Sequence, residues 1–407
     1  MRAIVFHGIG DIRLENVPDP IIEQPTDAIV RLTTSAICGT DLHMVRGTLS
    51  GMVPGTILGH EGVGIIEALG DDVRNLQVGD RVVIPSTIAC GSCAYCRDGY
   101  FSQCDTANPN GPLAGTAFFG GPAQSGPFHG LQAEKARIPF ANVGLVKLPA
   151  AIPDEQAILL SDILPTAYFG AKIAEIKPGN TVAIFGCGPV GLLAIQCALH
   201  FKAGMVIAID CLPDRLDKAR ELGAATVNYE AEDPVETIRR LTGGIGVDRA
   251  IDAVGVDANR AHHGPAAAIG HVLDQEFRHE LRQLGVTHAP AGTNWHPGDA
   301  PAQTLIWAAH ALAKAGTLSI IGVYPEAAMA FPIGVAMNKN LTLQMGNCPH
   351  RRYIPELIEL VGSGAIDPSR ILTDRVSLTD DVMRAFAAFD RREPNVNKVT
   401  MAPASVP

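Results

Sequence analysis

The sequence predicts an α/β fold in two parts, a partly open β-barrel followed by a doubly wound parallel sheet. In the first 150 residues, short strand-like runs such as Ala28–Leu32, Gly64–Leu69 and Arg81–Ile84 are separated by Gly, Pro and Asp turns. This pattern of short strands separated by turn residues is typical of a β-barrel. From about Glu155 the chain instead alternates between strand-like and helix-like segments, which favours a parallel sheet.

The elements of the second part can be placed in order. Thr181–Phe185 is predicted to be a buried strand, Leu192–Lys202 the helix after it, and Val206–Asp210 the next strand. Two later apolar runs, Ala250–Val254 and Thr317–Val323, supply further strands. Strands that alternate with helices in this way form βαβ units, so they are expected to run parallel.

An irregular insertion interrupts this second part. Residues 256–304 are rich in Gly, Pro and His and lack sustained periodicity, although His271–Leu284 is predicted to form a helix. Long irregular segments inside compact domains are often functional loops or lids. Near the C-terminus, a helix at Ile354–Val361 and a strand near Asn397–Met401 are expected. We therefore predict three segments: a first domain at 1–155, a second at 156–345, and a return to the first domain at 346–407.

Composition excludes several classes of function. The 407 residues are 47% hydrophobic and 18% charged, the balance of an ordinary globular protein. A formal net charge of −10 argues against a nucleic-acid partner, because phosphate binding needs a basic face. The chain starts with only four consecutive apolar residues, Ala3–Phe6, and the apolar stretch Val182–Phe201 is broken by Gly and Pro. We therefore expect no membrane segment and a cytoplasmic location.

Four of the nine cysteines are closely spaced in the run ACGSCAYCRDGYFSQC. Their C-x2-C-x2-C-x7-C spacing lets one loop bring four thiolates onto a tetrahedral Zn²⁺, with Zn–S bonds of about 2.3 Å. A site with four thiolates has no open position for a substrate, so the spacing predicts a structural zinc. The alternative is a group of redox-active or inert thiols. The predicted ligands, in a lobe at about 88–106, are Cys90, Cys93, Cys96 and Cys104.

A second motif predicts a dinucleotide site. The run Gly186–Gly191 matches G-x-G-x-x-G, directly follows a predicted strand and opens a predicted helix. Asp210 ends the next strand, where its carboxylate would bind the adenosine ribose and repel the 2′-phosphate of NADP. We therefore predict NAD, with the nearby Arg215 as a complication; the alternative is a Gly-rich turn without a ligand. The predicted cofactor contacts are Gly186, Gly188, Pro189, Val190, Gly191, Asp210 and Arg215.

The closed cysteine site implies that any reactive zinc lies elsewhere, with three protein ligands and one open position. Cys38-Gly39-Thr40-Asp41-Leu42-His43 and Gly59-His60-Glu61 are the candidate segments, although Cys38 alone could also be a core thiol. In their order along the chain, C-G-T-D-x-H, G-H-E, the four-cysteine lobe and G-x-G-x-x-G resemble the zinc-dependent alcohol dehydrogenases of the medium-chain dehydrogenase/reductase superfamily. The similarity covers nearly the whole chain.

This resemblance implies a GroES-like barrel, a Rossmann domain, and a catalytic zinc bound by Cys38, His60 and a third residue near the start of the second domain. Many relatives have a cysteine there, whereas this chain has Asp162 in the run SDILPT. An aspartate ligand resembles the glutathione-independent formaldehyde dehydrogenase and formaldehyde dismutase branch. The alternative for Asp162 is a cap on the following helix. Glu61 resembles a glutamate just behind the metal, which is either a transient ligand or part of a buried ion pair.

The resemblance also implies roles for other residues. Thr40 passes the alcohol proton to the nicotinamide ribose, and His43 relays it to solvent. Thr166 braces the nicotinamide ring, and His263 or His262 lies on the adenine side. Lys398 either contacts the pyrophosphate or is a surface lysine. Because family members of this type associate through the cofactor domain, a homodimer or homotetramer is expected.

We therefore predict a zinc-dependent, NAD-linked oxidoreductase with two zinc ions per chain, which interconverts an alcohol and its aldehyde or ketone by hydride transfer. A formaldehyde dehydrogenase or dismutase with tightly bound, recycled NAD is the second candidate. Against it, Ser86 stands where relatives often carry a bulky aromatic residue, which favours a larger substrate. A zinc-free quinone reductase or structural protein would lack the set of Cys38, His60 and Asp162, and a redox sensor would expose its thiols.

Overall fold

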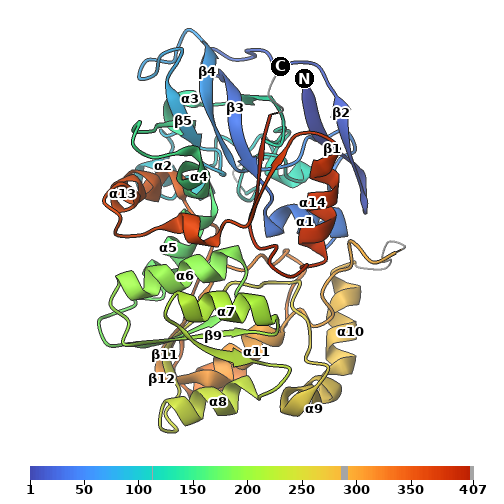
Figure 1. The fold of residues 1–407 in the computed structure, drawn as a ribbon, viewed down its shortest axis with the longest axis vertical. Coiled ribbons are helices and arrows are strands. Elements are labelled where there is room, and N and C mark those ends of the chain that lie inside the picture. Colours follow the sequence, from blue (N-terminus) through green and yellow to red (C-terminus); the bar gives the residue numbers. More distant parts are fainter. Residues whose placement is uncertain (112, 286–291, 404–407) are drawn as a thin grey trace. The chain divides into compact units, whose positions relative to one another are not determined.

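The computed structural model describes residues 1–111, 113–285 and 292–403 (Figure 1). The chain forms two compact units. The first unit consists of Met1–Pro165, Pro290–Trp295 and Asn347–Pro407, and the second of Thr166–Ala289 and His296–Gly346. The C-terminal segment of the chain therefore returns to the unit in which the chain began.

Most strands of the first unit belong to one sheet, which contains seven strands among the described residues. Its order is β14-β15-β3-β4-β5-β7, with β6 paired to β3 outside this path. The outer strands β14 and β7 are not paired with each other in the described chain, so the barrel is open, as predicted. Strands β1 and β2 form a separate antiparallel hairpin. The bounds are β1 Arg2–Gly8, β2 Asp11–Asn16, β3 Ala28–Ala36, β4 Gly62–Leu69, β5 Arg81–Ile84, β6 Lys135–Ile138, β7 Val146–Lys147, β14 Asp374–Ser377 and β15 Val399–Ala402.

Two helices of the first unit, α1 (Gly39–Arg46) and α14 (Asp381–Asp390), lie side by side (Figure 1). Leu42 of α1 and Phe386 of α14 belong to one buried hydrophobic cluster, which also contains Val399 of β15. Because α1 begins shortly after β3 ends, this packing helps to fix the turn between them. The remaining helices of the unit are α2 Ala94–Arg97, α3 Ala141–Gly144, α4 Asp154–Ala157 and α13 His350–Gly362.

The second unit contains a parallel sheet with six strands among the described residues, in the order β10-β9-β8-β11-β12-β13. In this doubly wound order the first strand, β8, has the second on one side and the fourth on the other. The predicted parallel sheet is therefore confirmed. The strand bounds are β8 Thr181–Phe185, β9 Met205–Asp210, β10 Ala225–Asn228, β11 Val247–Asp252, β12 Leu312–Ile320 and β13 Thr342–Met345.

The helices that alternate with these strands complete the unit. The helix after β8 begins at Pro189, three residues earlier than predicted, because proline fits the first position of a helix. Among the described residues, no helix combines the length and apolar character needed to cross a membrane. The bounds are α5 Ile163–Ile173, α6 Pro189–His200, α7 Pro213–Glu221, α8 Pro234–Leu241, α9 Gly264–Val272, α10 Asp274–Gln283, α11 Gln303–Ala311 and α12 Ile333–Asn338.

The insertion contains two helices where one was predicted. The helix expected at His271–Leu284 is replaced by α9, which ends at Val272, and α10, which begins at Asp274. Arg260 ties the start of the insertion to its later parts, because its guanidinium bonds to Asp274 and, at 2.8 Å, to Asp299. His288, one of the histidines of the insertion, lies outside the described residues.

Candidate functional site

Four side chains from distant parts of the first unit meet at one buried point. The Cys38 sulfur, a His60 ring nitrogen and carboxylate oxygens of Glu61 and Asp162 all lie within 4.8 Å of one another. All four residues are buried, and Glu61 is fully so. Cys38, His60 and Asp162 are the predicted ligands of one zinc, and Glu61 is predicted to lie just behind them. The fold brings all four together.

Cys38 reaches the cluster from the start of a helix. It precedes α1, and its backbone N–H donates to Asp41 Oδ2 at 2.9 Å, one bond of a capping box. Asp41 is fully buried, and the same oxygen accepts from the side-chain amide of Gln132 at 2.8 Å. Its other oxygen lies 3.3 Å from His60 Nδ1. Asp41 therefore orients both Cys38 and His60.

The other members of the cluster come from two segments that are tied together. His60 and Glu61 directly precede β4, and Asp162 directly precedes α5. Gly62, the residue after Glu61, donates its N–H to Ser161 Oγ at 3.0 Å. This bond between their neighbours fixes the separation of Glu61 and Asp162 near the backbone, so it does not depend on flexible side chains.

The distances inside the cluster match those expected around a four-coordinate zinc. Asp162 Oδ2 lies 3.5 Å from Cys38 Sγ and 3.4 Å from His60 Nε2. With bonds of about 2.3 Å to sulfur and about 2.0 Å to nitrogen and oxygen, tetrahedral geometry separates these pairs by about 3.5 and about 3.3 Å. Thiolate, imidazole and carboxylate are also chemically suited to Zn²⁺. The residues present therefore fit a zinc ion with one open position.

The buried groups of the cluster interact strongly, and their pKa values are shifted as a result. Burial raises the pKa of the Cys38 thiol to about 11. Burial lowers the pKa of His60, but Asp41, Cys38 and Asp162 together outweigh this effect, and the pKa lies well above its usual value. Burial raises the pKa of Asp162, but hydrogen bonds from His350 and His60 hold it well below the usual range. The site therefore keeps Asp162 negative and retains positive charge beside it.

Glu61 and Lys398 form a fully buried ion pair beside the cluster. Lys398 Nζ donates to Glu61 Oε1 at 2.6 Å and to the Ile37 carbonyl oxygen at 2.9 Å. Glu61 Oε2 has no hydrogen-bond partner among the described residues, and burial raises the pKa of this carboxyl group to about 7 despite the lysine. The family resemblance implies a place for Lys398 at the pyrophosphate. Because its ammonium is 0% exposed and paired with Glu61, that expectation is corrected.

Thr40 and His43, the residues expected to move a proton, both lie on α1. Thr40 is in the first turn and is half-buried, whereas His43 is buried. His43 Nδ1 lies 3.3 Å from Thr48 Oγ1, and this hydroxyl also donates to the His43 carbonyl oxygen at 3.2 Å. The helix that begins after Cys38 therefore positions both residues.

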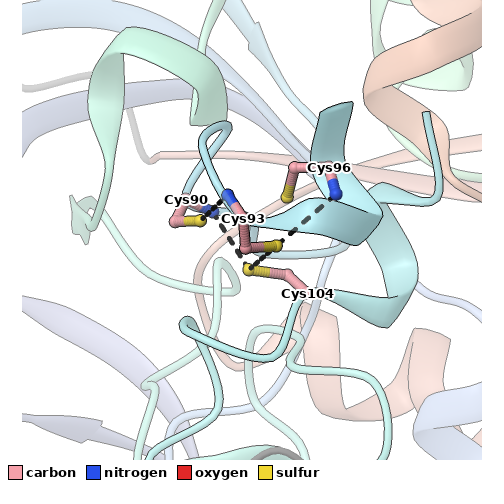
Figure 2. A group of neighbouring side chains, drawn as sticks. All are labelled: Cys90, Cys93, Cys96 and Cys104. Carbon is pink, nitrogen blue, oxygen red and sulfur yellow. Dashed lines mark hydrogen bonds between the residues drawn. The ribbon is translucent and has the colours of Figure 1, made fainter. Parts of the chain in front are cut away.

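The four closely spaced cysteines also converge (Figure 2). Their sulfur atoms lie within 4.8 Å of one another. Cys90 N–H donates to Cys104 Sγ at 3.3 Å, Cys93 N–H to Cys90 Sγ at 3.4 Å, and Cys96 N–H to Cys93 Sγ at 3.4 Å. Burial raises the pKa of Cys90, but hydrogen bonds from Ser92 and Cys93 outweigh it and bring the pKa to about 6, whereas burial raises the pKa of Cys104. All nine cysteines of the chain are free. This donor set fits a closed four-thiolate zinc site.

In the second unit, the Gly-rich run forms the turn between β8 and α6. Gly186 has a φ of +91°, a left-handed conformation that favours glycine. A Cβ atom on Gly191 would lie 1.8 Å from the Gly186 carbonyl oxygen, so only glycine allows the helix to start this close to the strand. Gly188 is the N-cap of α6, and Pro189 and Val190 begin its first turn. The unpaired N–H groups at such a helix start suit a pyrophosphate.

Asp210, at the end of β9, is fixed beside this turn. Its Oδ2 atom accepts from Cys187 N–H at 2.7 Å, and its Oδ1 atom accepts from Cys211 N–H at 2.7 Å. Arg215 lies on α7, with its guanidinium 3.7 Å from the position that a Cβ atom on Gly188 would occupy. The fold thus brings both a carboxylate and a guanidinium close to the Gly-rich turn.

Two other predicted cofactor residues lie elsewhere in the second unit. The His263 side chain is exposed, and its backbone N–H donates to a carboxylate oxygen of Glu230 at 2.7 Å. Thr166 is half-buried on α5. The backbone around His263 is therefore anchored while its ring remains accessible.

Comparisons with known proteins agree with this geometry. Residues 24–150 match the alcohol dehydrogenase GroES-like domain family, and residues 189–264 match the zinc-binding dehydrogenase family. An uncharacterised zinc-type alcohol dehydrogenase-like protein of Bacillus subtilis is 36% identical, over 99% of this chain and 100% of its own. The glutathione-independent formaldehyde dehydrogenase of Pseudomonas aeruginosa is 33% identical, over 83% of this chain and 80% of its own. The alcohol dehydrogenase structure from Thermus sp. ATN1 is 34% identical with a TM-score of 0.80, over 99% of this chain and 100% of its own. The chain belongs to the zinc-dependent alcohol dehydrogenase family.

Membership of this family confirms the predicted architecture, a GroES-like domain combined with a Rossmann-type parallel sheet. The chain is therefore an oxidoreductase of the zinc-type alcohol dehydrogenase class, a family that acts on small alcohols or aldehydes. Ser86, which entered the prediction of substrate size, is buried and donates its N–H to the Ser161 carbonyl oxygen at 3.1 Å. Ser86 thus lies beside the segment that carries Asp162.

Sequence reasoning missed one residue beside the Cys38 cluster, His350. It is 4% exposed, and its Nε2 atom lies 2.8 Å from Asp162 Oδ1. It comes 188 residues after Asp162 in the chain and belongs to none of the motifs described above. No spacing signal could therefore have identified it before the fold was known.

Proposed function

We propose that this chain is a zinc-dependent, NAD-linked oxidoreductase that interconverts an alcohol and its aldehyde or ketone. The observation that carries this proposal is the convergence of Cys38 Sγ, His60 Nε2 and Asp162 Oδ2 at distances suited to one zinc ion. Three protein donors leave a fourth position for a substrate oxygen, which is the arrangement of a catalytic zinc. Family membership supports the same class of reaction.

In this proposal Cys38, His60 and Asp162 hold the metal, and other residues of the chain move the proton. Bound zinc would lower the pKa of the alcohol oxygen, and bound NAD would accept the hydride. Thr40 Oγ1 would accept the proton that leaves the alcohol oxygen and give its own hydroxyl proton to the nicotinamide ribose, and His43 would relay the proton from the ribose toward solvent. The support for these two roles is their position on the helix that starts after Cys38.

We assign Glu61 to the charge balance of the metal site. Its Oε1 atom accepts from Lys398, whereas Oε2 has no hydrogen-bond partner among the described residues. Oε2 is therefore the oxygen that remains available for a transient approach to the metal. The buried ion pair and the transient ligand, which were alternatives at the level of sequence, involve different oxygens of the same carboxylate.

For the cofactor we propose NAD rather than NADP. The Asp210 carboxylate is held by backbone N–H groups next to the Gly-rich turn, where a fixed negative charge favours ribose hydroxyls over a 2′-phosphate. The positive charge of Arg215 instead favours the 2′-phosphate of NADP. The ratio of the NAD and NADP affinities therefore decides between the two cofactors. We also propose that Thr166 contacts the nicotinamide end of the cofactor and that His263 contacts its adenine end.

We further propose two zinc ions per chain with different duties. The site of Cys38, His60 and Asp162 is catalytic, and the cysteine lobe at 88–106 holds a structural zinc that four thiolates close off from substrate. In domain terms, the first unit is then the catalytic domain and the second unit the NAD-binding domain.

The second candidate function is that of a formaldehyde dehydrogenase or dismutase with tightly bound NAD. The observation that favours it is the aspartate donor Asp162, together with the 33% identity to a formaldehyde dehydrogenase. The small side chain of Ser86 favours a larger alcohol instead. We therefore rank this candidate second.

Metal analysis with one variant tests the catalytic zinc. The wild-type protein should contain two zinc ions per chain. Asp162→Asn removes a charged donor at nearly constant volume, so this variant should hold one zinc and lose more than about 100-fold of its alcohol oxidation activity. Asp381→Asn, at an exposed position of the same unit, is the control and should keep both ions. Two zinc ions and full activity in Asp162→Asn would refute the proposal.

A cofactor assay separates the two candidate functions. The purified protein is first examined for bound nicotinamide absorbance and is then assayed on a panel of alcohols with and without added NAD. A strict requirement for added NAD, with activity on longer or aromatic alcohols, supports the first candidate. Turnover of formaldehyde without added cofactor would establish the second.

A further inference from the structure

One residue that contacts the cluster of Cys38, His60, Glu61 and Asp162 has no role in the reaction proposed above. His350, the first residue of α13, is buried, and its Nε2 atom lies 2.8 Å from Asp162 Oδ1. Its Nδ1 atom lies 3.2 Å from Oγ1 of the buried Thr87. All three residues belong to the first unit. They form a hydrogen-bonded chain that runs from Thr87 through the imidazole ring to Asp162.

The two carboxylate oxygens of Asp162 have different surroundings. Oδ2 faces the cluster, 3.5 Å from Cys38 Sγ and 3.4 Å from His60 Nε2, which are the distances expected between ligands of one zinc. Oδ1 is the oxygen in contact with His350. The geometry therefore separates an oxygen suited to the metal from an oxygen held by a hydrogen bond.

The proton positions follow from the donors and acceptors present. An ionised carboxylate can only accept hydrogen bonds, so His350 donates Nε2–H to Asp162. In a neutral ring Nδ1 then carries no hydrogen and accepts from the Thr87 hydroxyl. Thr87 is itself positioned by a backbone β-bridge to Phe118. The orientation of the His350 ring is therefore set from both of its nitrogens.

We propose that His350 is a positioning residue that holds Asp162 as a one-oxygen ligand, with Oδ2 on the metal and Oδ1 on the imidazole. This inference rests on the proposed zinc site of Cys38, His60 and Asp162. A carboxylate that is free to rotate can bind zinc through both oxygens, and the second oxygen would then fill the position that a substrate needs. By retaining Oδ1, His350 keeps that position open.

Two substitutions and a matched control distinguish positioning from ordinary structural support. His350→Phe keeps a buried ring of similar size and removes both nitrogens. His350→Gln, the control, supplies an amide N–H near the place of Nε2 and should restore the bond to Asp162. Thr87→Val removes only the hydroxyl at the other end of the chain. For each protein, zinc release to a chromogenic chelator, the visible spectrum after cobalt substitution, and the thermal midpoint are measured.

The proposal predicts effects confined to one metal site. His350→Phe should release one of its two zinc ions about 10–100-fold faster than the wild type and the other at an unchanged rate. Its cobalt spectrum should weaken at that site, because a second Asp162 oxygen raises the coordination number. His350→Gln should stay within about threefold of the wild-type rate, and Thr87→Val should fall between the two variants.

Wild-type rates of zinc release and unchanged cobalt spectra in His350→Phe and Thr87→Val would overturn the proposal. A fall in the thermal midpoints would not rescue the proposal, because a purely structural contact lowers the midpoint and leaves zinc release and the cobalt spectrum unchanged. If His350→Phe does not fold, Thr87→Val decides by the same two measurements. If Asp162→Asn keeps all the zinc and the full activity of the wild type, the proposed function fails as well, so this variant tells the two failures apart.

Discussion

The Cys38 thiol illustrates how a single buried side chain can couple metal binding to pH. Burial raises its pKa to about 11 in the absence of metal, so at neutral pH the sulfur carries its proton. Zinc binds the thiolate, and therefore has to displace this proton. Burial lowers the pKa of His60, but Asp41, Cys38 and Asp162 together raise it, which also strengthens the competition between proton and metal.

We expect metal binding at this cluster to weaken as the pH falls. Each proton displaced lowers the apparent affinity by about tenfold per pH unit, so cobalt should bind the metal-free protein at least about 100-fold more weakly at pH 6 than at pH 8. Chelator competition followed by visible absorption measures the cobalt affinity at each pH. The two metal sites can be told apart, because cobalt in the four-thiolate site has stronger charge-transfer bands. Cys197→Ala, which removes a buried thiol outside both clusters, is the control and should behave as the wild type. An affinity independent of pH would contradict the expectation.

The cluster could be predicted from the sequence only in part, and individual residues show why. Cys38, His60 and Glu61 lie in short local motifs whose residue order carries a signal. Asp162 was found only because the family resemblance pointed to its position. The roles of Lys398 and His350 depend on contacts across 337 and 188 residues of sequence, and no local pattern records such pairings.

Among the elements, the cysteine lobe owes its shape to metal ligands more than to secondary structure. Its helix α2 has only four residues, and the N–H groups around it point at sulfur atoms. A segment with so little regular structure needs another source of order, and a metal held by four thiolates supplies it.

We therefore expect Cys104→Ser to cost stability before it costs chemistry. The variant should lose one zinc per chain, and its thermal midpoint should fall by on the order of 10 °C. Activity per folded molecule at low temperature should stay close to that of the wild type, because Cys104 is not part of the Cys38 cluster. Calorimetry, metal analysis and activity assays check these points. A normal midpoint in a protein with one zinc would show that the lobe does not depend on its metal.

The turn between β8 and α6 gives a second test at this level. Gly191→Ala places a methyl group 1.8 Å from the Gly186 carbonyl oxygen, which costs about 3 kcal/mol or more and pushes the helix away from the strand. We expect lower stability and loss of NAD binding, measured by calorimetry and fluorescence titration. Gly334→Ala, with no atom within 4 Å of the new methyl group, is the matched control and should bind NAD normally. Normal NAD binding by Gly191→Ala would contradict this expectation.

The reliability of element prediction followed the length and apolar character of each segment. β8 was predicted at its observed bounds, because four consecutive buried residues precede a clear glycine turn. β10 and β13 were not predicted, since each has four residues and a mixed burial pattern. The break between α9 and α10 was missed because neither Gly nor Pro marks it. Short strands such as β10 and β13 are defined by their pairing with neighbouring strands rather than by a local sequence pattern.

For the molecule as a whole, the edge of the parallel sheet points to self-association. β13 is the outermost strand, and its Met345 is 62% exposed; in the same unit Ile333 and Met337 of α12 are 66% and 79% exposed. The edge of a sheet, with its unpaired backbone groups, is a common site of pairing with another chain. We expect a homodimer or homotetramer in light scattering, and Met345→Lys should shift it toward the monomer. Leu113→Lys, at a fully exposed residue of the first unit, should not. A monomeric wild type would contradict the expectation.

The return of the C-terminal segment to the first unit has a consequence for synthesis on the ribosome. Lys398, which neutralises the buried Glu61, follows it by 337 residues, and β15 beside it completes the sheet next to β3. At roughly 5–20 residues per second, Glu61 waits on the order of 20–60 seconds for its counter-charge. All of the second unit emerges during that delay. Glu61 can therefore be buried with its lysine only after the whole of the second unit has been synthesised.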